Sequence, residues 1–254
     1  MKNNLKKRLS GVSQLRSVAV VCAAVLFTGC TDLGYLLSND KVTDADNDKV
    51  VFVGDSIFAL SGEIQNQLES KAGETFLRYT VSGAELSGEL IAPSIPNQFR
   101  EAIADNPGID TIVGDAGGND ILIPAIAFNS NKCKTPWYRF GRLSQECIDF
   151  IDDIYVEGVD FLNEMAESGV QQGILVGYYY TKNGLFRLKD LKEAVDYGNA
   201  TLARACENSV LNCQFVDPRP VINESDIIFD GIHPADSGSQ KIADLIWPKL
   251  QPML

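Results

Sequence analysis

The sequence predicts an α/β fold with one doubly wound parallel sheet in a single domain. Five short apolar runs alternate with five amphipathic stretches, and no internal repeat is present. The first run, 50–53, is β-branched and aromatic without a charge, as expected of a strand buried on both faces. Polar clusters follow several of these runs, at the carboxyl edge where open α/β sheets bind ligands.

The hydrophobic pattern places each element. The expected strands are 50–53, 76–81, 111–114, 173–178 and 213–216, and the expected helices are 57–72, 96–104, 147–168, 188–208 and 237–250. The stretch 121–147 is long and irregular for a link between a strand and a helix, and it carries Trp137, Tyr138 and Phe140. It is either a wall or lid of an acyl or alcohol pocket or a surface loop stapled for stability.

Residues 1–29 predict a secretory signal peptide. Five basic residues precede an apolar stretch, 18–27, that is too short for a comfortable transmembrane span. The segment 26–30, Leu-Phe-Thr-Gly-Cys, resembles a bacterial lipobox, so we expect Cys30 to be lipidated; ordinary signal cleavage and an uncleaved anchor are the alternatives. We expect a tether over 30–47 and a folded domain over 48–254.

The expected location is the bacterial cell envelope, with the membrane reached through the N-terminal lipid. Thr31 stands where an Asp retains some lipoproteins at the inner membrane, which favours the outer membrane. Without lipidation the protein would be secreted.

Charge and cysteine content argue against a nucleic-acid partner and favour disulfides over a zinc site. The chain has a net charge of −12, and without residues 1–29 it has −17, which argues against nucleic acid as a partner. Once Cys22 and Cys30 are set aside, four cysteines remain in a chain expected to be exported, and their order favours the pairs Cys133–Cys147 and Cys206–Cys213 among three pairings. The alternative, a zinc site, lacks paired C-x₂-C spacing.

Three polar clusters carry the candidate chemistry. Ser56 follows the first strand within Gly-Asp-Ser, where it is either a helix cap or a nucleophile. The only histidine, His233, lies three residues after Asp230, a spacing that lets the carboxylate hold the imidazole in one tautomer. Asn119 follows two glycines after the third strand, where it is either a turn residue or an amide aimed at an oxyanion.

These clusters, in this order, resemble the SGNH (GDSL) hydrolase superfamily over residues 48–250. The matching blocks are Gly-Asp-Ser at 54–56, Gly83 after the second strand, Gly-Gly-Asn-Asp at 117–120 and Asp-x-x-His at 230–233. The resemblance implies a flavodoxin-like five-stranded sheet in the order 2-1-3-4-5. It also implies a triad of Ser56, His233 and Asp230, and an oxyanion hole from the Ser56 and Gly83 N–H groups and the Asn119 amide. No metal or organic cofactor is expected.

The function expected from these residues is hydrolysis of carboxylic esters, with a small-molecule ester or a lipid as substrate. Two alternatives stay open at this point. The same residues suit a polysaccharide O-acetyl esterase or O-acetyltransferase. A non-catalytic binding lipoprotein of the cell envelope is the third hypothesis, which the presence of all four blocks disfavours.

Overall fold

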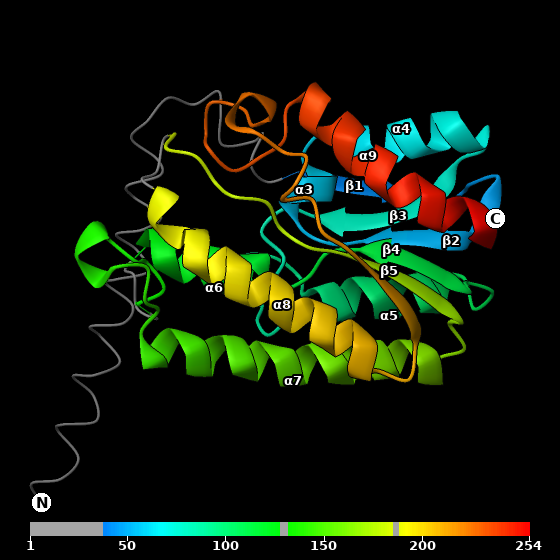
Figure 1. The fold of residues 1–254 in the computed structure, drawn as a ribbon. Helices are drawn as coiled ribbons and strands as arrows, with labels where there is room; N and C mark the ends of the chain where they lie inside the picture. The colour runs from blue at the N-terminus through cyan, green and yellow to red at the C-terminus, as the bar shows by residue number, and fades with distance from the viewer. Residues whose placement is uncertain (1–37, 128–131, 185–187) are drawn as a thin grey trace, which may run out of the picture. The chain divides into compact units, whose positions relative to one another are not determined.

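The computed structural model describes residues 38–127, 132–184 and 188–254 (Figure 1). Its six-stranded sheet has the order β1-β3-β2-β4-β5-β6, in which only the β1–β3 pair is antiparallel. The strands are β1 (Asn39–Val42), β2 (Asn47–Val53), β3 (Phe76–Val81), β4 (Thr111–Gly114), β5 (Gln172–Val176) and β6 (Asn212–Val216). The predicted signal peptide and Cys30, the predicted site of lipidation, lie outside the described residues.

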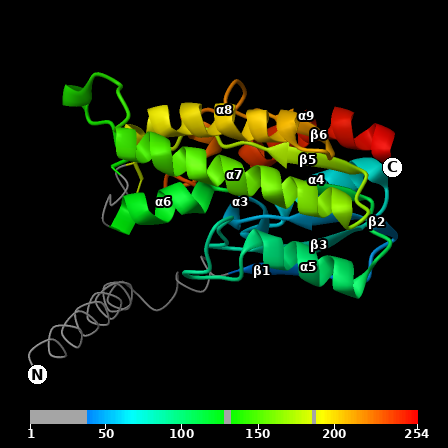
Figure 2. The same ribbon diagram turned by 90° about the horizontal axis from the view of Figure 1, so that it is seen from below.

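Helices cover both faces of the sheet, which confirms the doubly wound α/β prediction (Figures 1 and 2). The α-helices are α3 (Ser56–Ala59), α4 (Glu63–Ala72), α5 (Ile95–Asp105), α6 (Gly118–Ala127), α7 (Gln145–Glu167), α8 (Lys192–Asn208) and α9 (Asp236–Leu250). Short 3₁₀ turns are η1 (Trp137–Arg139), η2 (Lys189–Leu191), η3 (Glu224–Asp226) and η4 (Gln251–Met253). No helix in the described ranges is long and apolar enough to cross a bilayer.

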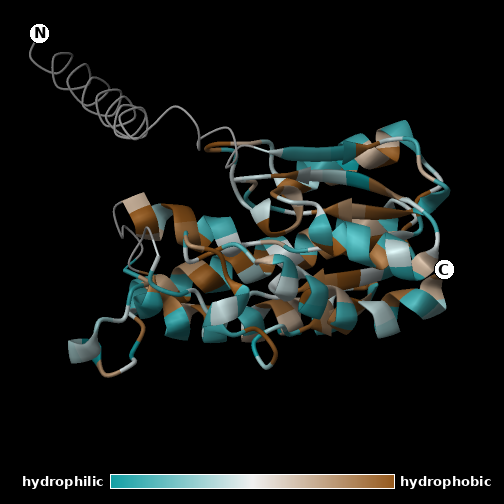
Figure 3. Cartoon of the chain, turned by 90° about the horizontal axis from the view of Figure 1, so that it is seen from above, coloured by the Kyte–Doolittle hydropathy of each residue, from teal (hydrophilic) through white to brown (hydrophobic). Residues whose placement is uncertain are grey.

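The central strand β2 shows why its sequence is apolar without alternation. Val51 and Val53 face the core shared with α5, α7 and α8, whereas Val50 and Phe52 face the core shared with α4 and α9. Because both faces are buried over positions 50–53, all four of these positions are hydrophobic. The strands in the middle of the domain are accordingly largely hydrophobic in Figure 3.

The five parallel strands have the predicted 2-1-3-4-5 order, but the sheet has a sixth strand that the sequence analysis missed. β1 lies within 30–47, which we expected to be a tether, and pairs with β3 from Asn39–Val81 to Val42–Arg78. The folded domain therefore begins earlier than residue 48. β1 is polar because only one of its edges is paired, and the buried Arg78 guanidinium pairs with Asp40 at 3.0 Å.

Two predictions of local structure, one of a helix and one of an irregular stretch, were also wrong in detail. The helix expected over 57–72 is interrupted, since Gly62 adopts φ 63° between α3 and α4. The stretch 121–147, expected to be irregular, begins inside α6, which continues to Ala127 despite Pro124. The remainder of that stretch contains η1 and ends in the first turn of α7.

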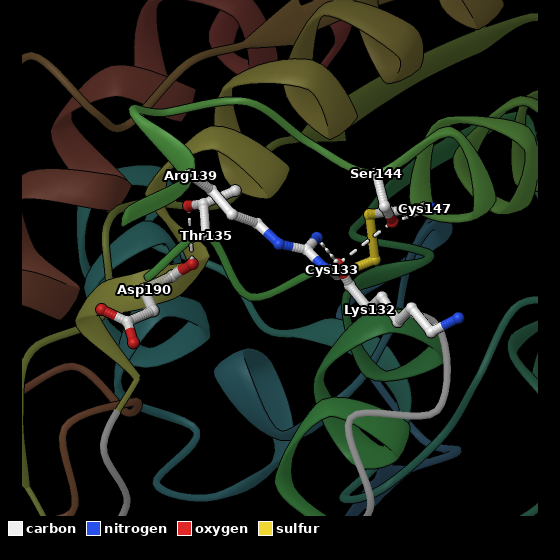
Figure 4. Close-up of a disulfide and its surroundings, with 7 residues drawn as sticks. All are labelled: Lys132, Cys133, Thr135, Arg139, Ser144, Cys147 and Asp190. Atoms are coloured by element: carbon white, nitrogen blue, oxygen red, sulfur yellow. Dashed lines mark hydrogen bonds between the residues drawn. A yellow bond between two sulfur atoms is a disulfide. The ribbon is translucent and has the colours of Figure 1, made fainter. Parts of the chain in front are cut away.

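Two disulfides join the predicted cysteine pairs. Cys133–Cys147 has a Cα–Cα distance of 5.0 Å and Cys206–Cys213 one of 5.2 Å. The first closes the loop that carries η1 (Figure 4). The second joins the last turn of α8 to β6.

Candidate active site

Ser56 lies at a tight turn between β2 and α3. Gly54 has φ 150°, and a Cβ atom there would lie 2.3 Å from Asp115 Oδ1, so only glycine fits. The Asp55 carboxylate caps α3 by accepting a hydrogen bond from the Ile57 N–H at 2.9 Å. The Ser56 hydroxyl is therefore fixed at the carboxyl edge of the sheet, and the residue is only 8% exposed.

His233 reaches Ser56 from the far end of the chain. Its Nε2 lies 2.8 Å from Ser56 Oγ, and its Nδ1 lies 2.6 Å from Asp230 Oδ2. The other Asp230 oxygen accepts the N–H groups of Ile232 and His233 at 2.8 and 3.1 Å. The Tyr179 hydroxyl donates to the Ile232 carbonyl at 2.6 Å, which ties this loop to the segment after β5.

The environment keeps Asp230 ionised. Burial alone would raise the pKa of Asp230, but the hydrogen bond and charge of His233, together with the two backbone N–H groups, lower it. A carboxylate at Nδ1 holds the proton there and leaves the Nε2 lone pair free to accept from the serine hydroxyl. The three predicted triad residues are thus in direct contact.

Gly83 and Asn119 come from different elements, and Asn119 contacts the loop that carries Gly83. Gly83 follows β3 with φ 80°, and Asn119 lies in the first turn of α6. The Asn119 amide donates to the Ala84 carbonyl at 2.9 Å, which occupies one of its two N–H groups. Asp120 holds the same loop, accepting at 2.8 Å from each of the N–H groups of Leu86 and Ser87.

Ser56, Gly83 and Asn119 each keep one N–H group without an acceptor in the described structure. Within the described parts of the chain, no hydrogen-bond acceptor faces the Ser56 N–H or the Gly83 N–H. The second amide N–H of Asn119 is the third donor. Such donors are what a developing oxyanion requires.

A second buried carboxylate pair lies in the turn before Ser56. The Asp55 N–H donates to Asp115 Oδ1 at 2.7 Å, and the Tyr178 hydroxyl donates to Asp55 Oδ2 at 2.9 Å. Burial raises the pKa of Asp115 well above its ordinary value, and the negative charge of Asp55 raises it further. Burial also raises the pKa of Asp55, while the Ile57 N–H and the Tyr178 hydroxyl oppose that shift. Of the two carboxyl groups, Asp115 is the one whose ionisation is disfavoured both by burial and by a neighbouring negative charge.

Two supporting residues were missed by the sequence analysis. The Gln98 amide bonds both the N–H and the carbonyl of Gly54, at 2.8 and 3.0 Å. The Asn199 amide bonds both backbone groups of Tyr178, at 2.8 and 2.6 Å. Both amides lie on buried faces of helices, and a polar residue on an apolar stripe was the signal that could have revealed them.

A pocket opens at Ser56 and Asn119 and runs between α6, α7 and α8. Its cavity volume is about 80 Å³. Tyr178 and Tyr179 contribute from the segment after β5. Most of the wall is aliphatic, with side chains such as Ile121, Leu122, Ile151, Ile154, Leu191 and Val195.

The loop closed by the Cys133–Cys147 disulfide supports that wall. The disulfide Cys133–Cys147 packs in one buried apolar cluster with Ile151, Leu191 and Ala194, all of which line the pocket. Over the described residues, no three His, Cys, Asp or Glu side chains converge to hold a metal ion.

Comparisons with known proteins agree with this geometry at the level of the fold. No protein-family model matches the chain, and no curated protein is similar to it in sequence. Among solved structures, a Slackia heliotrinireducens protein assigned to the SGNH hydrolases superposes with a TM-score of 0.50 at 14% identity, covering 79% of this chain and 97% of its own. The chain has the SGNH hydrolase fold.

Two further structures with this SGNH-type fold superpose somewhat better. A Bacteroides fragilis protein assigned as an acylhydrolase has a TM-score of 0.57 at 18% identity, covering 83% of this chain and 89% of its own. A carbohydrate acetylesterase from Sinorhizobium meliloti has a TM-score of 0.55 at 13% identity, covering 81% of this chain and 99% of its own.

Proposed function

We propose that this chain is a serine hydrolase that cleaves carboxylic esters. The observation that carries the proposal is the unbroken contact series from Ser56 Oγ to His233 Nε2 and from His233 Nδ1 to Asp230, at 2.8 and 2.6 Å. A serine hydroxyl becomes a nucleophile when a base in this position accepts its proton. The site lies at the carboxyl edge of the sheet, where this fold class binds ligands.

The reaction follows from those contacts. Ser56 Oγ attacks the ester carbonyl while His233 Nε2 takes the hydroxyl proton, and the N–H groups of Ser56, Gly83 and Asn119 stabilise the oxyanion. His233 then returns the proton to the leaving alcohol, and the acyl group stays on Ser56. Water, deprotonated by His233, attacks the acyl-serine, and the acid leaves as Ser56 is reprotonated.

The pocket favours an aliphatic acyl group over acetate. The acyl carbon is bonded to Ser56 Oγ in the intermediate, so a pocket that opens at Ser56 is placed to hold the acyl chain. Gly198 on α8 borders this pocket, and a Cβ atom there would meet only Ile121 Cδ1, at 3.8 Å. A glycine inside a helix costs about 1 kcal/mol relative to alanine, and here it leaves room in the pocket.

A second candidate is removal or transfer of acetyl groups on a polysaccharide. It is favoured by the fold similarity to the Sinorhizobium meliloti carbohydrate acetylesterase. An O-acetyltransferase would use the same residues with a sugar hydroxyl in place of water. The aliphatic lining of the pocket argues for a longer acyl group than acetyl.

The direct test measures hydrolysis of p-nitrophenyl esters from acetate to palmitate, with Ser56→Ala as the matched inactive variant. We expect kcat/KM to rise with chain length until the pocket is filled, by about fourfold per methylene. Activity that Ser56→Ala retains would contradict the proposal. If the folded protein cleaves no ester and a fluorophosphonate does not label Ser56, the binding-protein hypothesis is the better one.

Gly198→Leu tests the acyl pocket separately from the catalytic residues. Filling the pocket should lower kcat/KM for octanoate by at least about tenfold relative to acetate. Ala200→Leu, an exposed position of the same helix, is the control and should leave the chain-length profile unchanged. Equal profiles in both variants would place the acyl group elsewhere.

Lipidation at Cys30 and placement in the outer membrane stay predictions. Incorporation of labelled palmitate that is lost in Cys30→Ser would establish the anchor. Release of an unlabelled chain cleaved near Cys30 would favour a secreted protein.

A further inference from the structure

The loop closed by Cys133–Cys147 displays large aromatic side chains to solvent. Trp137 is 84% exposed, Tyr138 61% and Phe140 84%. Single exposed hydrophobic residues are normal, but three within four positions are a patch of the kind that marks an interaction site. We call residues 132–142 the aromatic tip.

The aromatic tip is held firmly, so its exposure does not result from a loose loop. Thr135 bonds the Asp190 carbonyl through its N–H at 2.7 Å and its hydroxyl at 3.0 Å (Figure 4). The same hydroxyl donates to Glu193 on α8. Ser144 donates to the Lys132 carbonyl at 3.2 Å, beside the disulfide. These contacts present the aromatic residues in a defined position.

The charge of the aromatic tip is opposite to that of the protein. The chain as a whole has a net charge of −12, yet no acidic residue occurs from Ile121 to Gln145. That segment contains four basic residues, all of them in the tip: Lys132, Lys134, Arg139 and Arg142. Lys132 pairs with Glu146, at the border of the segment, at 2.7 Å. An anionic surface would be repelled by most of the molecule and attracted by the tip.

The aromatic tip projects from the end of the domain towards which the parallel strands point (Figures 1 and 2). This is the end that carries Ser56. Two more exposed hydrophobic residues, Leu90 and Ile91, belong to the loop of Gly83 at the same edge. The described domain also begins there, because Asn39 pairs with Val81 at the carboxyl end of β3.

We propose that the aromatic tip inserts into the headgroup region of an anionic phospholipid bilayer and turns the catalytic end of the domain towards the membrane. Trp and Tyr favour the membrane interface because their rings are amphipathic, and Lys and Arg beside them bind lipid phosphates. Each basic residue near such a surface strengthens partitioning by about fivefold. This interaction is separate from ester hydrolysis and from any lipid on Cys30.

The experiment uses the full chain with Trp247→Phe, which leaves Trp137 as the only tryptophan. We expect its emission to shift to the blue and to be quenched by brominated lipid in phosphatidylglycerol vesicles, but not in phosphatidylcholine vesicles. Replacing the four basic residues by Gln should weaken the quenching by at least about 100-fold in lipid concentration. Because the probe is in the tip, attachment through the N-terminus alone does not produce this signal.

The matched control moves the probe to the other end of the domain. Val210 is 74% exposed just before β6, so Val210→Trp in a chain with Trp137→Phe and Trp247→Phe should show no lipid quenching. Unchanged Trp137 emission in anionic vesicles, or equal quenching at both positions, would overturn the proposal. A blue shift with soluble oligosaccharide but not with vesicles would assign the tip to a carbohydrate partner instead.

Discussion

Two buried aspartates at the carboxyl edge of the sheet have opposite electrostatic environments. Asp230 and Asp115 are only 4% and 2% exposed, and burial alone would raise the pKa of either. Asp230 faces His233 and two N–H groups, so its pKa is lowered. Asp115 faces the carboxylate of Asp55, so its pKa is raised further. The surroundings of Asp230 favour its ionised form, whereas those of Asp115 favour its protonated form.

The difference teaches that burial does not decide what a carboxyl group does. At Asp230, the partners stabilise the anion, which lets it stabilise an imidazolium during the proposed reaction. At Asp115, which accepts the Asp55 N–H at 2.7 Å, a second anion beside Asp55 would be costly, so the neighbouring carboxylate opposes ionisation of Asp115.

The largest effect is expected from Asp230→Asn. An amide at this position cannot stabilise the histidine cation and can favour the wrong tautomer, so kcat should fall by about 10⁴ with the fold intact. Steady-state kinetics and a thermal melt measure the two effects. A loss of less than tenfold would show that Asp230 does not orient the base.

Asn119→Ala should cost about 10²–10³ in kcat, because one donor to the oxyanion is lost. The variant also removes the hydrogen bond from Asn119 to Ala84, which could displace the loop that carries Gly83. Asp120→Asn is the matched control, because it weakens the hold on the same loop and leaves the Asn119 amide in place. Unchanged turnover in Asn119→Ala would remove this residue from the site.

Tyr178→Phe tests the second carboxylate pair directly. It removes the hydroxyl that donates to Asp55, and we expect a loss of about 1–3 kcal/mol in the free energy of unfolding. Urea denaturation measures this loss. Tyr180→Phe is the control: it removes a partly exposed hydroxyl that donates to Asp196, and it should lower the free energy of unfolding by less.

The smallest effect, and the sharpest test of the contrast, is the pH dependence of stability between about pH 3 and pH 8. Asp115 has a raised pKa, so its favourable contribution is complete below the ordinary value of 3.8 and is lost as the pH rises. Asp115→Asn should therefore gain stability relative to the parent above that value. Asp230 has a lowered pKa, so its contribution to stability is present above the ordinary value and is lost as the pH falls. Asp230→Asn should therefore lose stability relative to the parent as the pH rises. Parallel pH profiles in the two variants would refute the contrast.

The parallel part of the fold was predictable because its strands are buried on both faces. The strands Phe76–Val81 and Thr111–Gly114 have the bounds expected from their apolar runs. β1 was not predictable in this way, since Asn-Asp-Lys-Val has no apolar pattern and its place depends on pairing with β3. The one local hint was Arg78 inside an apolar strand, a charge that needed carboxylates such as Asp40 and Glu69.

The triad contacts followed from residue order, but the scaffold around them did not. Ser56 stands just after β2, whereas Asp230 and His233 stand in a short motif in the segment between β6 and α9. Gln98 and Asn199 act through amide contacts to backbone more than 20 residues away, and only the folded chain brings these groups together. The pocket likewise depends on how α6, α7 and α8 pack, which no single helix specifies.

The antiparallel edge strand also limits how far the site could lie from a lipid attached at Cys30. Ser38 precedes β1 and bonds Ser82, the residue before Gly83, through backbone and side chain at 2.9 Å. A chain anchored at Cys30 would have eight residues to reach Ser38, a span of at most about 28 Å when fully extended. Under such an anchor, the catalytic end could not move farther from the membrane than roughly the thickness of one bilayer core. The proposed hydrolase would then act on esters held in the membrane or diffusing along it.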